Sequence, residues 1–340
     1  MTDPILRACS TVSFGPIDIG DAAGFYRPID IGDAAGFYRR LNSHMTALCR
    51  SLPETMQTKA MMFLMEYGRI AVGESLDFFK HYYAPSWSAL YWTVAAPGAC
   101  GAISEQDLDD ALRCQAMAMS LHSFDDHLVE GGVAASHLTL LVRSQAWRFM
   151  KDAIGRFCDG LPGGSAIAAG LINDYYCAIT EGEASKDLDG YCDLFRKQMA
   201  TWVVMPVLCA RKSGKGEEFI TALRGSYESF GIAWRLLDDI QDLEDDMADG
   251  AHSAVYVCLD DRGHALWNEK GQDTGKGAEK RSERICAMVS EGKIIESIAG
   301  RIVAELDKAA ALADGIGLRG LGDEYRVLAG PVREWVDRNR

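Results

Sequence analysis

Residues 230–246 read FGIAWRLLDDIQDLEDD, and this stretch decides the predicted fold. Its first half is mostly apolar, and Asp238, Asp242 and Asp246 then follow at four-residue spacing. On a helix these carboxylates share one face, about 6 Å of axial rise apart. Like charges at that spacing destabilise an isolated helix, so the pattern favours a cation between them. Magnesium is the natural candidate because it bridges carboxylates to substrate phosphates. The alternative is a solvated acidic helix end.

A second predicted helix has the same design. It covers residues 104–130 and ends in SLHSFDDHLVE, so that Asp125, Asp126 and Glu130 follow a mostly apolar run. Asp126 and Glu130 are four residues apart and share a face. Two buried helices with acidic ends can face each other across a bundle and hold a diphosphate through several Mg²⁺ ions. Ions in that position stabilise the negative charge that develops on a leaving diphosphate.

The remaining sequence predicts more long helices and no sheet. From about residue 41 onward, apolar residues recur at three- and four-residue spacings. The helix at 104–130 is expected to begin at Ser104 and to end before Gly131. Further helices are predicted at 134–158, 165–183, 188–211, 216–249, 283–313 and 321–338, with a polar, glycine-rich loop at 260–282. We therefore predict an all-α protein, with one large helical bundle at residues 41–340 around a central apolar cavity.

Residues 1–40 form a predicted N-terminal arm. Within it, PIDIGDAAGFYR at residues 16–27 recurs letter for letter at residues 28–39. Two copies are too few for a stacked repeat architecture. We interpret the repeat as a recent duplication in a tolerant terminal segment.

Composition excludes several classes of protein. The formal net charge is −14, and no basic stripe suggests nucleic acid as a partner. The ten cysteines include no CxxC pair, so a structural zinc site has no support. No apolar run approaches the roughly 18 residues of a membrane-spanning helix, and the N-terminus does not read as a signal peptide. We expect a cytoplasmic protein without a transmembrane segment.

The two acidic stretches resemble the class I isoprenoid synthase superfamily, and most closely its trans-polyprenyl diphosphate synthases, the polyprenyl synthetase family. These enzymes carry two DDxxD motifs on facing helices of an all-α bundle. FGIAWRLLDDIQD matches the second motif, and DDHLVE matches the first in a DDxxxE form. The similarity covers roughly residues 100–250. It implies that the metal ligands are Asp125, Asp126, Glu130, Asp238, Asp239, Asp242 and, from the spacing, Asp246.

The resemblance also implies an activity. Mg²⁺, as three ions with diphosphate bound, would assist ionisation of an allylic prenyl diphosphate, and the prenyl cation would pass to isopentenyl diphosphate. YCDLFRKQMATW at 191–202 resembles the family stretch that leads to a lysine. This resemblance implies a catalytic role for Arg196 and Lys197. Arg235 would have a similar role. The growing tail would pass Ser120 and Leu121. The same resemblance implies a homodimer and small-molecule prenyl diphosphates as substrates.

The sequence differs from the family pattern at several positions, so other functions stay open. Its upstream Gly-Lys-Arg signature and the Arg-Arg pair after the first motif are missing, so Arg69, Lys80 and Arg143 are the candidates for holding the second diphosphate. Arg235 replaces the family glutamine and could pair either with substrate or with the acidic cluster.

Two alternative functions follow from these departures. A terpene cyclase acting on one prenyl diphosphate would suit the Asp238, Asp242 and Asp246 spacing, and Tyr325-Arg326 reverses a pair found in cyclases. Aromatic residues could stabilise a carbocation or simply pack; these are Tyr82, Tyr83, Trp87, Tyr91 and Trp92. A third hypothesis is a non-catalytic partner subunit of a prenyltransferase.

Overall fold

The computed structural model describes residues 4–15, 34–96, 99, 101–129, 131–180, 185–269 and 276–339. Every regular element in these ranges is a helix, which confirms the all-α prediction. The helices of the first half are α1 (Pro4–Cys9), α2 (Ala34–Arg50), α3 (Glu54–Tyr67), α4 (Pro85–Ala95), α5 (Glu105–Val129), α6 (His137–Phe157), α7 (Gly164–Thr180) and α8 (Leu188–Gln198). Those of the second half are α9 (Ala200–Lys212), α10 (Glu217–Gln241), α11 (Leu243–Asp249), α12 (Ala254–Val257), α13 (Asp261–Trp267), α14 (Lys276–Glu291), α15 (Ile294–Gly315) and α16 (Arg319–Asn339).

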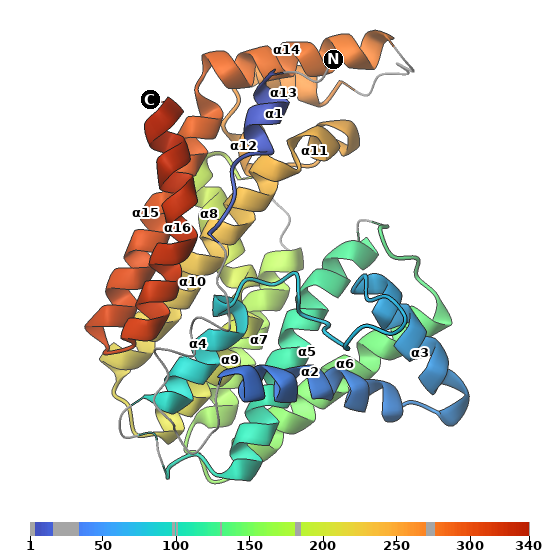
Figure 1. The fold of residues 1–340 in the computed structure, drawn as a ribbon, viewed down its shortest axis with the longest axis vertical. Helices are drawn as coiled ribbons and strands as arrows, with labels where there is room; N and C mark the ends of the chain where they lie inside the picture. The colour runs from blue at the N-terminus through green and yellow to red at the C-terminus, as the bar shows by residue number, and fades with distance from the viewer. Residues whose placement is uncertain are drawn as a thin grey trace.

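The bundle is organised around α9, which is buried from Ala200 to Ala210. A helix that is apolar on all sides belongs in the middle of a core. Both α5 and α10 pack against it, and α10 in turn packs against α15, which packs against α16. Figure 1 shows α10, α15 and α16 running side by side on one flank, with α5 and α6 together on the other. The core therefore brings the two helices that carry the acidic motifs to a shared neighbour.

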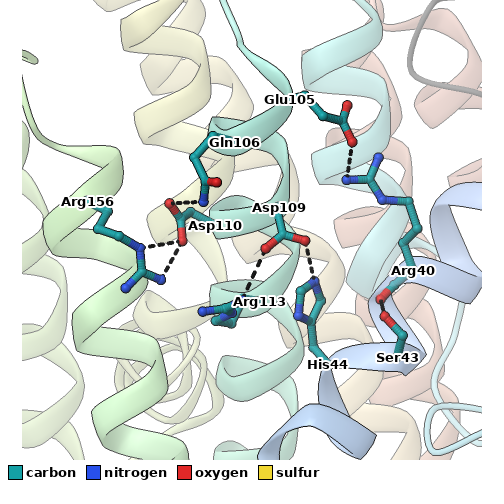
Figure 2. A network of polar contacts seen from close by, with 9 residues as sticks. All are labelled: Arg40, Ser43, His44, Glu105, Gln106, Asp109, Asp110, Arg113 and Arg156. Atoms are coloured by element: carbon teal, nitrogen blue, oxygen red, sulfur yellow. Dashed lines mark hydrogen bonds and ion pairs between the residues drawn. The ribbon is translucent and has the colours of Figure 1, made fainter.

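Polar contacts fix the N-terminal half of α5 between α2 and α6 (Figure 2). Arg156 on α6 donates to the buried Asp110 carboxylate from Nε at 2.9 Å and from Nη2 at 2.5 Å. On the other side, Arg40 of α2 pairs with Glu105 at 2.7 Å. His44 of α2 lies 3.6 Å from Asp109, and burial lowers its pKa to about 4. This network anchors α5 at the end remote from its acidic motif.

The helix boundaries follow local signals in the sequence. Ser104 and Asp107 form a reciprocal cap, because each backbone N–H donates to the other side chain, at 2.9 and 3.1 Å. Gly131, with φ +80°, lies just beyond α5 in the left-handed region that glycine tolerates. Gly250 ends α11 in the same way, with φ +72°. The predicted start and stop of the 104–130 helix therefore agree with the structure, although Glu130 itself lies outside the described residues.

Four predicted segments differ from the structure. The 283–313 helix is interrupted at Gly292 and Lys293 into α14 and α15. The 188–211 helix is interrupted at Met199 into α8 and α9, and the 216–249 helix is interrupted at Asp242 into α10 and α11. The 260–282 segment, predicted as a loop, contains α13 and the beginning of α14. Asp260 explains why α13 forms in a polar stretch, because its side chain accepts from the Gly263 N–H at 2.7 Å and caps the helix. Glycine content alone was a poor guide there.

Two parts of the predicted N-terminal arm at residues 1–40 lie within the described ranges. Residues 34–40, which include the end of the second repeat copy, form the first turns of α2, and residues 4–15 pack against the bundle. Residues 16–33, which hold most of the duplication, lie outside the described residues. Within the described ranges, no helix is both long enough and apolar enough to cross a membrane.

Candidate active site

A cavity of about 300 Å³ lies between the C-terminal ends of α5 and α10, and we call it the acidic cavity. Asp126 contributes from α5, and Trp234 and Asp238 contribute from α10. The other lining residues include His122, Phe195, Trp202, Arg235, Asp239, Asp242 and Asp246. The structure thus brings the two acidic sequence stretches to one cavity, although they are remote in the sequence.

Asp239 is the most heavily engaged carboxylate of the second motif. It is 2% exposed and accepts from the Tyr191 hydroxyl at 2.7 Å and from the Ala254 backbone N–H at 2.9 Å. Arg235 lies 3.0 Å from its other oxygen. Both oxygens are therefore occupied by protein donors, and the carboxylate ties α10 to α8 and to the first turn of α12.

Arg235 directs its charge into the acidic cluster. Its Nε donates to the Tyr191 hydroxyl at 2.8 Å, and its Nη1 lies 3.8 Å from Asp238. Burial works against the charged guanidinium, but Asp239 and Tyr191 outweigh it and raise the Arg235 pKa. Of the two partners that the sequence left open for this arginine, the structure shows the neighbouring aspartates.

Burial and neighbouring carboxylates disfavour the ionised forms of Asp242 and Asp246, although the charge of Arg235 opposes this effect. Burial, and then the charge of Asp239, raise the pKa of Asp246 to about 7. Its Oδ2 is buried and has no hydrogen-bond partner in the described part of the chain. Burial, followed by the charge of Asp245, raises the pKa of Asp242. An orphaned carboxylate oxygen beside other carboxylates is the chemistry that a divalent cation satisfies.

The protein groups do not form a complete metal cage by themselves. In the described ranges, no three acidic, histidine or cysteine side chains converge closely enough to hold an ion. Magnesium commonly takes only one or two carboxylates from the protein and its other ligands from water and substrate phosphates. The donor set at the acidic cavity therefore fits Mg²⁺ that arrives together with a diphosphate.

Asp125 is engaged elsewhere, although it is the neighbour of Asp126. Arg143 on α6 forms a bidentate ion pair with it, Nε to Oδ1 at 2.6 Å and Nη2 to Oδ2 at 2.8 Å. The Tyr175 hydroxyl lies 3.4 Å from Oδ2, and Asp125 is 6% exposed. Tyr175 had no place in the sequence prediction, because a tyrosine within an apolar helix gives no signal of its partner.

A second cavity of about 580 Å³ adjoins the first, and we call it the apolar cavity. Its walls are mostly apolar and come from α2, α3, α5 and α6: Met45, Leu48, Leu64, Leu121, Phe124, Val142 and Ala146. Ser120 also lines it, and its hydroxyl donates to the Ala116 carbonyl at 2.9 Å. The two cavities share Ser123, His127, Trp234 and Asp238 as lining residues. A ligand with a charged head and an apolar tail could therefore span both.

Basic side chains lie around the apolar cavity. Arg69, His81 and Arg143 line it, but Arg143 is already paired with Asp125. Arg69 has φ +52°, a left-handed conformation that is uncommon for a residue with a side chain. Lys80 donates to the Arg69 carbonyl at 2.6 Å and so supports this loop; it does not belong to the described lining. His81 was not predicted, since a lone histidine in a loop carries little signal.

Two predicted catalytic cations lie away from the acidic cavity. Lys197 is exposed, and Arg196 lies 3.6 Å from Asp193 on its own helix. Neither belongs to the described residues that line the cavity. Phe195, on the same helix, lines it instead, because successive residues of a helix point in different directions.

Aromatic side chains form the wall between the two cavities. The Trp234 ring lies 5.5 Å from Trp202, 5.6 Å from Tyr82 and 5.3 Å from Tyr83, measured between centroids. Tyr82 also donates to, or accepts from, the Ser123 hydroxyl at 2.8 Å. Of the aromatic residues singled out in the sequence, Tyr82 and Tyr83 are at the site, whereas Trp87 and Tyr91 are buried in the core.

Comparison with solved structures identifies the fold. A geranylgeranyl pyrophosphate synthase from Corynebacterium glutamicum matches with a TM-score of 0.65 at 14% identity, over 99% of this chain and 98% of that chain. A structure of geranylgeranyl pyrophosphate synthase from the same organism, complexed with isoprenyl diphosphate and magnesium, matches at 0.59, with 14% identity over 85% and 98% of the two chains. A geranylgeranyl pyrophosphate synthetase from Pyrococcus horikoshii matches at 0.63, with 13% identity over 87% and 97%.

Sequence comparison adds nothing to this result. No protein-family model matches the chain, and no curated protein matches it at a significant level. The chain therefore shares the all-α fold of the geranylgeranyl diphosphate synthases over nearly their whole length. At 13–14% sequence identity, the similarity establishes the fold and no more.

Proposed function

We propose that this chain is a magnesium-dependent prenyltransferase that ionises an allylic prenyl diphosphate and transfers the prenyl group to isopentenyl diphosphate. The observation that carries the proposal is the pair of adjoining cavities. Asp126 and Asp238 line the acidic cavity, and the apolar cavity shares Trp234 and Asp238 with it. Isoprenyl diphosphate and magnesium are bound in one of the structures with the same fold, which supports this choice of ligands.

Mg²⁺ would be held by Asp126, Asp238, Asp242 and Asp246, and we propose three ions by analogy with the resembled family. Glu130 remains a predicted ligand outside the described residues, and Asp125 could join only if it exchanged Arg143 for the metal. Asp239 is better assigned to positioning Arg235 and Tyr191. When bound, the ions would neutralise charge on the leaving diphosphate.

The chain's own residues would orient the substrate and exclude water. The carboxylates of Asp126 and Asp238 would hold the head group through the Mg²⁺ ions that they bind, and the apolar cavity would receive the tail, past Ser120 and Leu121. Rupture of the allylic C–O bond leaves a cation beside the aromatic wall of Tyr82, Trp202 and Trp234. The face of an aromatic ring stabilises a nearby cation, and closely packed apolar walls keep water from capturing it.

The basic rim of the apolar cavity favours elongation over cyclisation. Isopentenyl diphosphate would bring a second diphosphate to a chain with a formal net charge of −14, so it needs cationic partners. Arg69 and Arg143, which line the apolar cavity, would supply positive charge, and the imidazole of His81 in the same lining could add a hydrogen bond. Lys80, predicted for the same role, would act indirectly through the Arg69 loop. Arg196 and Lys197 would contribute only by changing their side-chain conformations.

Cyclisation of a single prenyl diphosphate is the second candidate. The observation that favours it is the engagement of Arg143 with Asp125, which reduces the positive charge available to a second diphosphate.

A non-catalytic partner subunit is less consistent with the geometry, because both acidic motifs contribute to the same cavity. A homodimer and a cytoplasmic location remain predictions from the resemblance and from the composition.

Product analysis tests the proposal. The purified chain is incubated with Mg²⁺ and allylic diphosphates of several lengths, with and without isopentenyl diphosphate, and products are identified by mass spectrometry. Elongation predicts a longer prenyl diphosphate only when isopentenyl diphosphate is present, and EDTA should eliminate it. A hydrocarbon or alcohol that forms equally well without isopentenyl diphosphate would establish the cyclase alternative. No turnover of any allylic diphosphate would contradict both enzyme readings.

A further inference from the structure

Residues 11–15 of the N-terminal segment are hydrogen-bonded to α16 and have no part in the mechanism above. The Trp335 indole N–H donates to Thr11 Oγ1 at 3.1 Å, and the Gly15 N–H donates to the Leu328 carbonyl at 3.2 Å. Val12 and Phe14 are 0% and 6% exposed, whereas Ser13 between them is exposed. One edge of the segment is thus buried along its length. In Figure 1 it descends from α1 alongside α10.

This segment reaches the candidate site at two points. The Gln241 side chain donates from Nε2 to the Val12 carbonyl at 2.8 Å, and the Phe14 ring meets Tyr83 edge-on with centroids 4.7 Å apart. Both Gln241 and Tyr83 line the apolar cavity. Tyr83 in turn contacts Trp234, the residue that the two cavities share, at 5.3 Å. Gln241 also lies between Asp238 and Asp242 in the second acidic motif.

We infer that residues 12–15 support the wall of the apolar cavity from its outer side. They hold the lining residues Tyr83 and Gln241 in place and so shield the prenyl cation from water. The inference rests on the proposed function. Val12 and Phe14 are positioning residues in this account, since they act through Gln241 and Tyr83. Tyr83 is only half-buried, so loss of the Phe14 ring would open one edge of it to solvent.

Isopentenyl diphosphate and water would compete to react with the prenyl cation. When the allylic C–O bond breaks, the diphosphate leaves with both electrons, and the cation can bond to the double bond of isopentenyl diphosphate. Water that enters can instead form a new C–O bond and lose a proton to the solvent, which yields a prenyl alcohol. A closed wall therefore favours carbon–carbon bond formation, because the cavity then contains less water.

Gly15 provides a way to displace this supporting segment. A Cβ at this position would lie 2.2 Å from the Val327 carbonyl oxygen on α16, so Gly15→Ala must push the segment away from that helix. Gly330→Ala is the matched control, because it lies on the same helix and its Cβ would meet no described atom within 4 Å. Phe14→Ala removes the cover over Tyr83 without a clash. Far-UV circular dichroism verifies that each full-length variant is folded.

The first measurement needs no activity. Hydroxyl-radical labelling followed by mass spectrometry reports the solvent exposure of the Tyr83 ring. We expect labelling to rise at least about twofold in Gly15→Ala and Phe14→Ala, because an edge that was covered becomes exposed, and to stay unchanged in Gly330→Ala. Unchanged labelling in both test variants would overturn the inference that the segment supports the cavity wall.

The second measurement is the fraction of ionised substrate that ends as prenyl alcohol. We expect it to rise at least about threefold in the two test variants and not in the control, as water gains access to the cation. Increased Tyr83 labelling with an unchanged alcohol fraction would overturn the shielding role. If the unaltered chain ionises no prenyl diphosphate, the proposed function and the shielding role both fail. The labelling still decides whether the segment supports the cavity wall.

Discussion

A buried glutamate should make the stability of this protein fall as the pH rises. Glu324 on α16 is 7% exposed and faces α4, where it accepts hydrogen bonds from the Ser88 hydroxyl and, at 2.8 Å, from the Trp92 indole N–H. Burial raises its pKa from the ordinary value of 4.5 to about 7, although both hydrogen bonds oppose the rise. The described part of the chain places no cation close enough to lower this pKa.

The sign and size of the effect follow from this shift. Below pH 4.5 the carboxyl group is protonated in both the folded and the unfolded chain, so it carries no penalty. Between pH 4.5 and 7 the unfolded chain releases the proton and the folded chain keeps it, so the free energy of unfolding falls as the pH rises. A shift from 4.5 to about 7 corresponds to roughly 3 kcal/mol at about 1.4 kcal/mol per pKa unit. Above pH 7 the loss is complete.

Glu324→Gln removes the ionisation and keeps the hydrogen bonds. The amide oxygen can accept from Trp92, and the amide NH₂ can donate to the Ser88 hydroxyl, as a protonated carboxyl group would. We expect the variant to match the unaltered chain near pH 4.5 and to exceed it by up to about 3 kcal/mol at pH 8, measured by urea unfolding.

An exposed glutamate on the same helix provides the control. Glu334→Gln should change the free energy of unfolding by less than about 0.5 kcal/mol at either pH, because its side chain lies in water. The reasoning would be refuted if Glu324→Gln differed from the unaltered chain by the same amount at pH 4.5 and at pH 8. It would also be refuted if the variant were less stable at pH 8.

Three further predictions concern the candidate site. Asp126→Asn and Asp238→Asn should each lower kcat at least about a hundredfold with the fold retained, measured by steady-state kinetics and circular dichroism; near-normal turnover would remove both from the metal site. Ser120→Phe should shorten the product by one or more isoprene units, as judged by mass spectrometry, because the larger side chain fills the apolar cavity; an unchanged product at normal activity would place the cavity floor elsewhere. Arg143→Met should lower the free energy of unfolding by about 3 kcal/mol, since it leaves the buried Asp125 carboxylate without its ion pair. Adding Asp125→Asn should recover most of that loss, and a purely additive double variant would argue against direct pairing.

The sequence alone was sufficient for the fold class. Long runs of apolar residues at helical spacing, without two-residue alternation, predicted the all-α bundle, and Ser104, Gly131 and Gly250 marked helix ends that the structure has. These signals are local, so they can be read without knowing what each helix packs against. The carboxylates at four-residue spacing were equally visible, because side chains on one helical face are set by the helix itself.

Only the tertiary structure decided which acidic residues face the cavity and which are paired within the protein. Asp238 and Asp239 are adjacent in the sequence, yet Asp239 is buried among Tyr191, Arg235 and Ala254, whereas Asp238 lies where the two cavities meet. Asp125 and Asp126 separate in the same way, one paired with Arg143 and the other lining the acidic cavity.

The physical reason is the same in both pairs. Consecutive residues of a helix point about 100° apart, so neighbouring carboxylates face different helices. Which helix lies opposite is set by long-range packing around α9, and so is the position of residues 12–15 beside Gln241. A pattern within one segment carries no information about a partner that is distant in the sequence. The sequence could therefore name the carboxylates, but packing selected the ones that face the cavity.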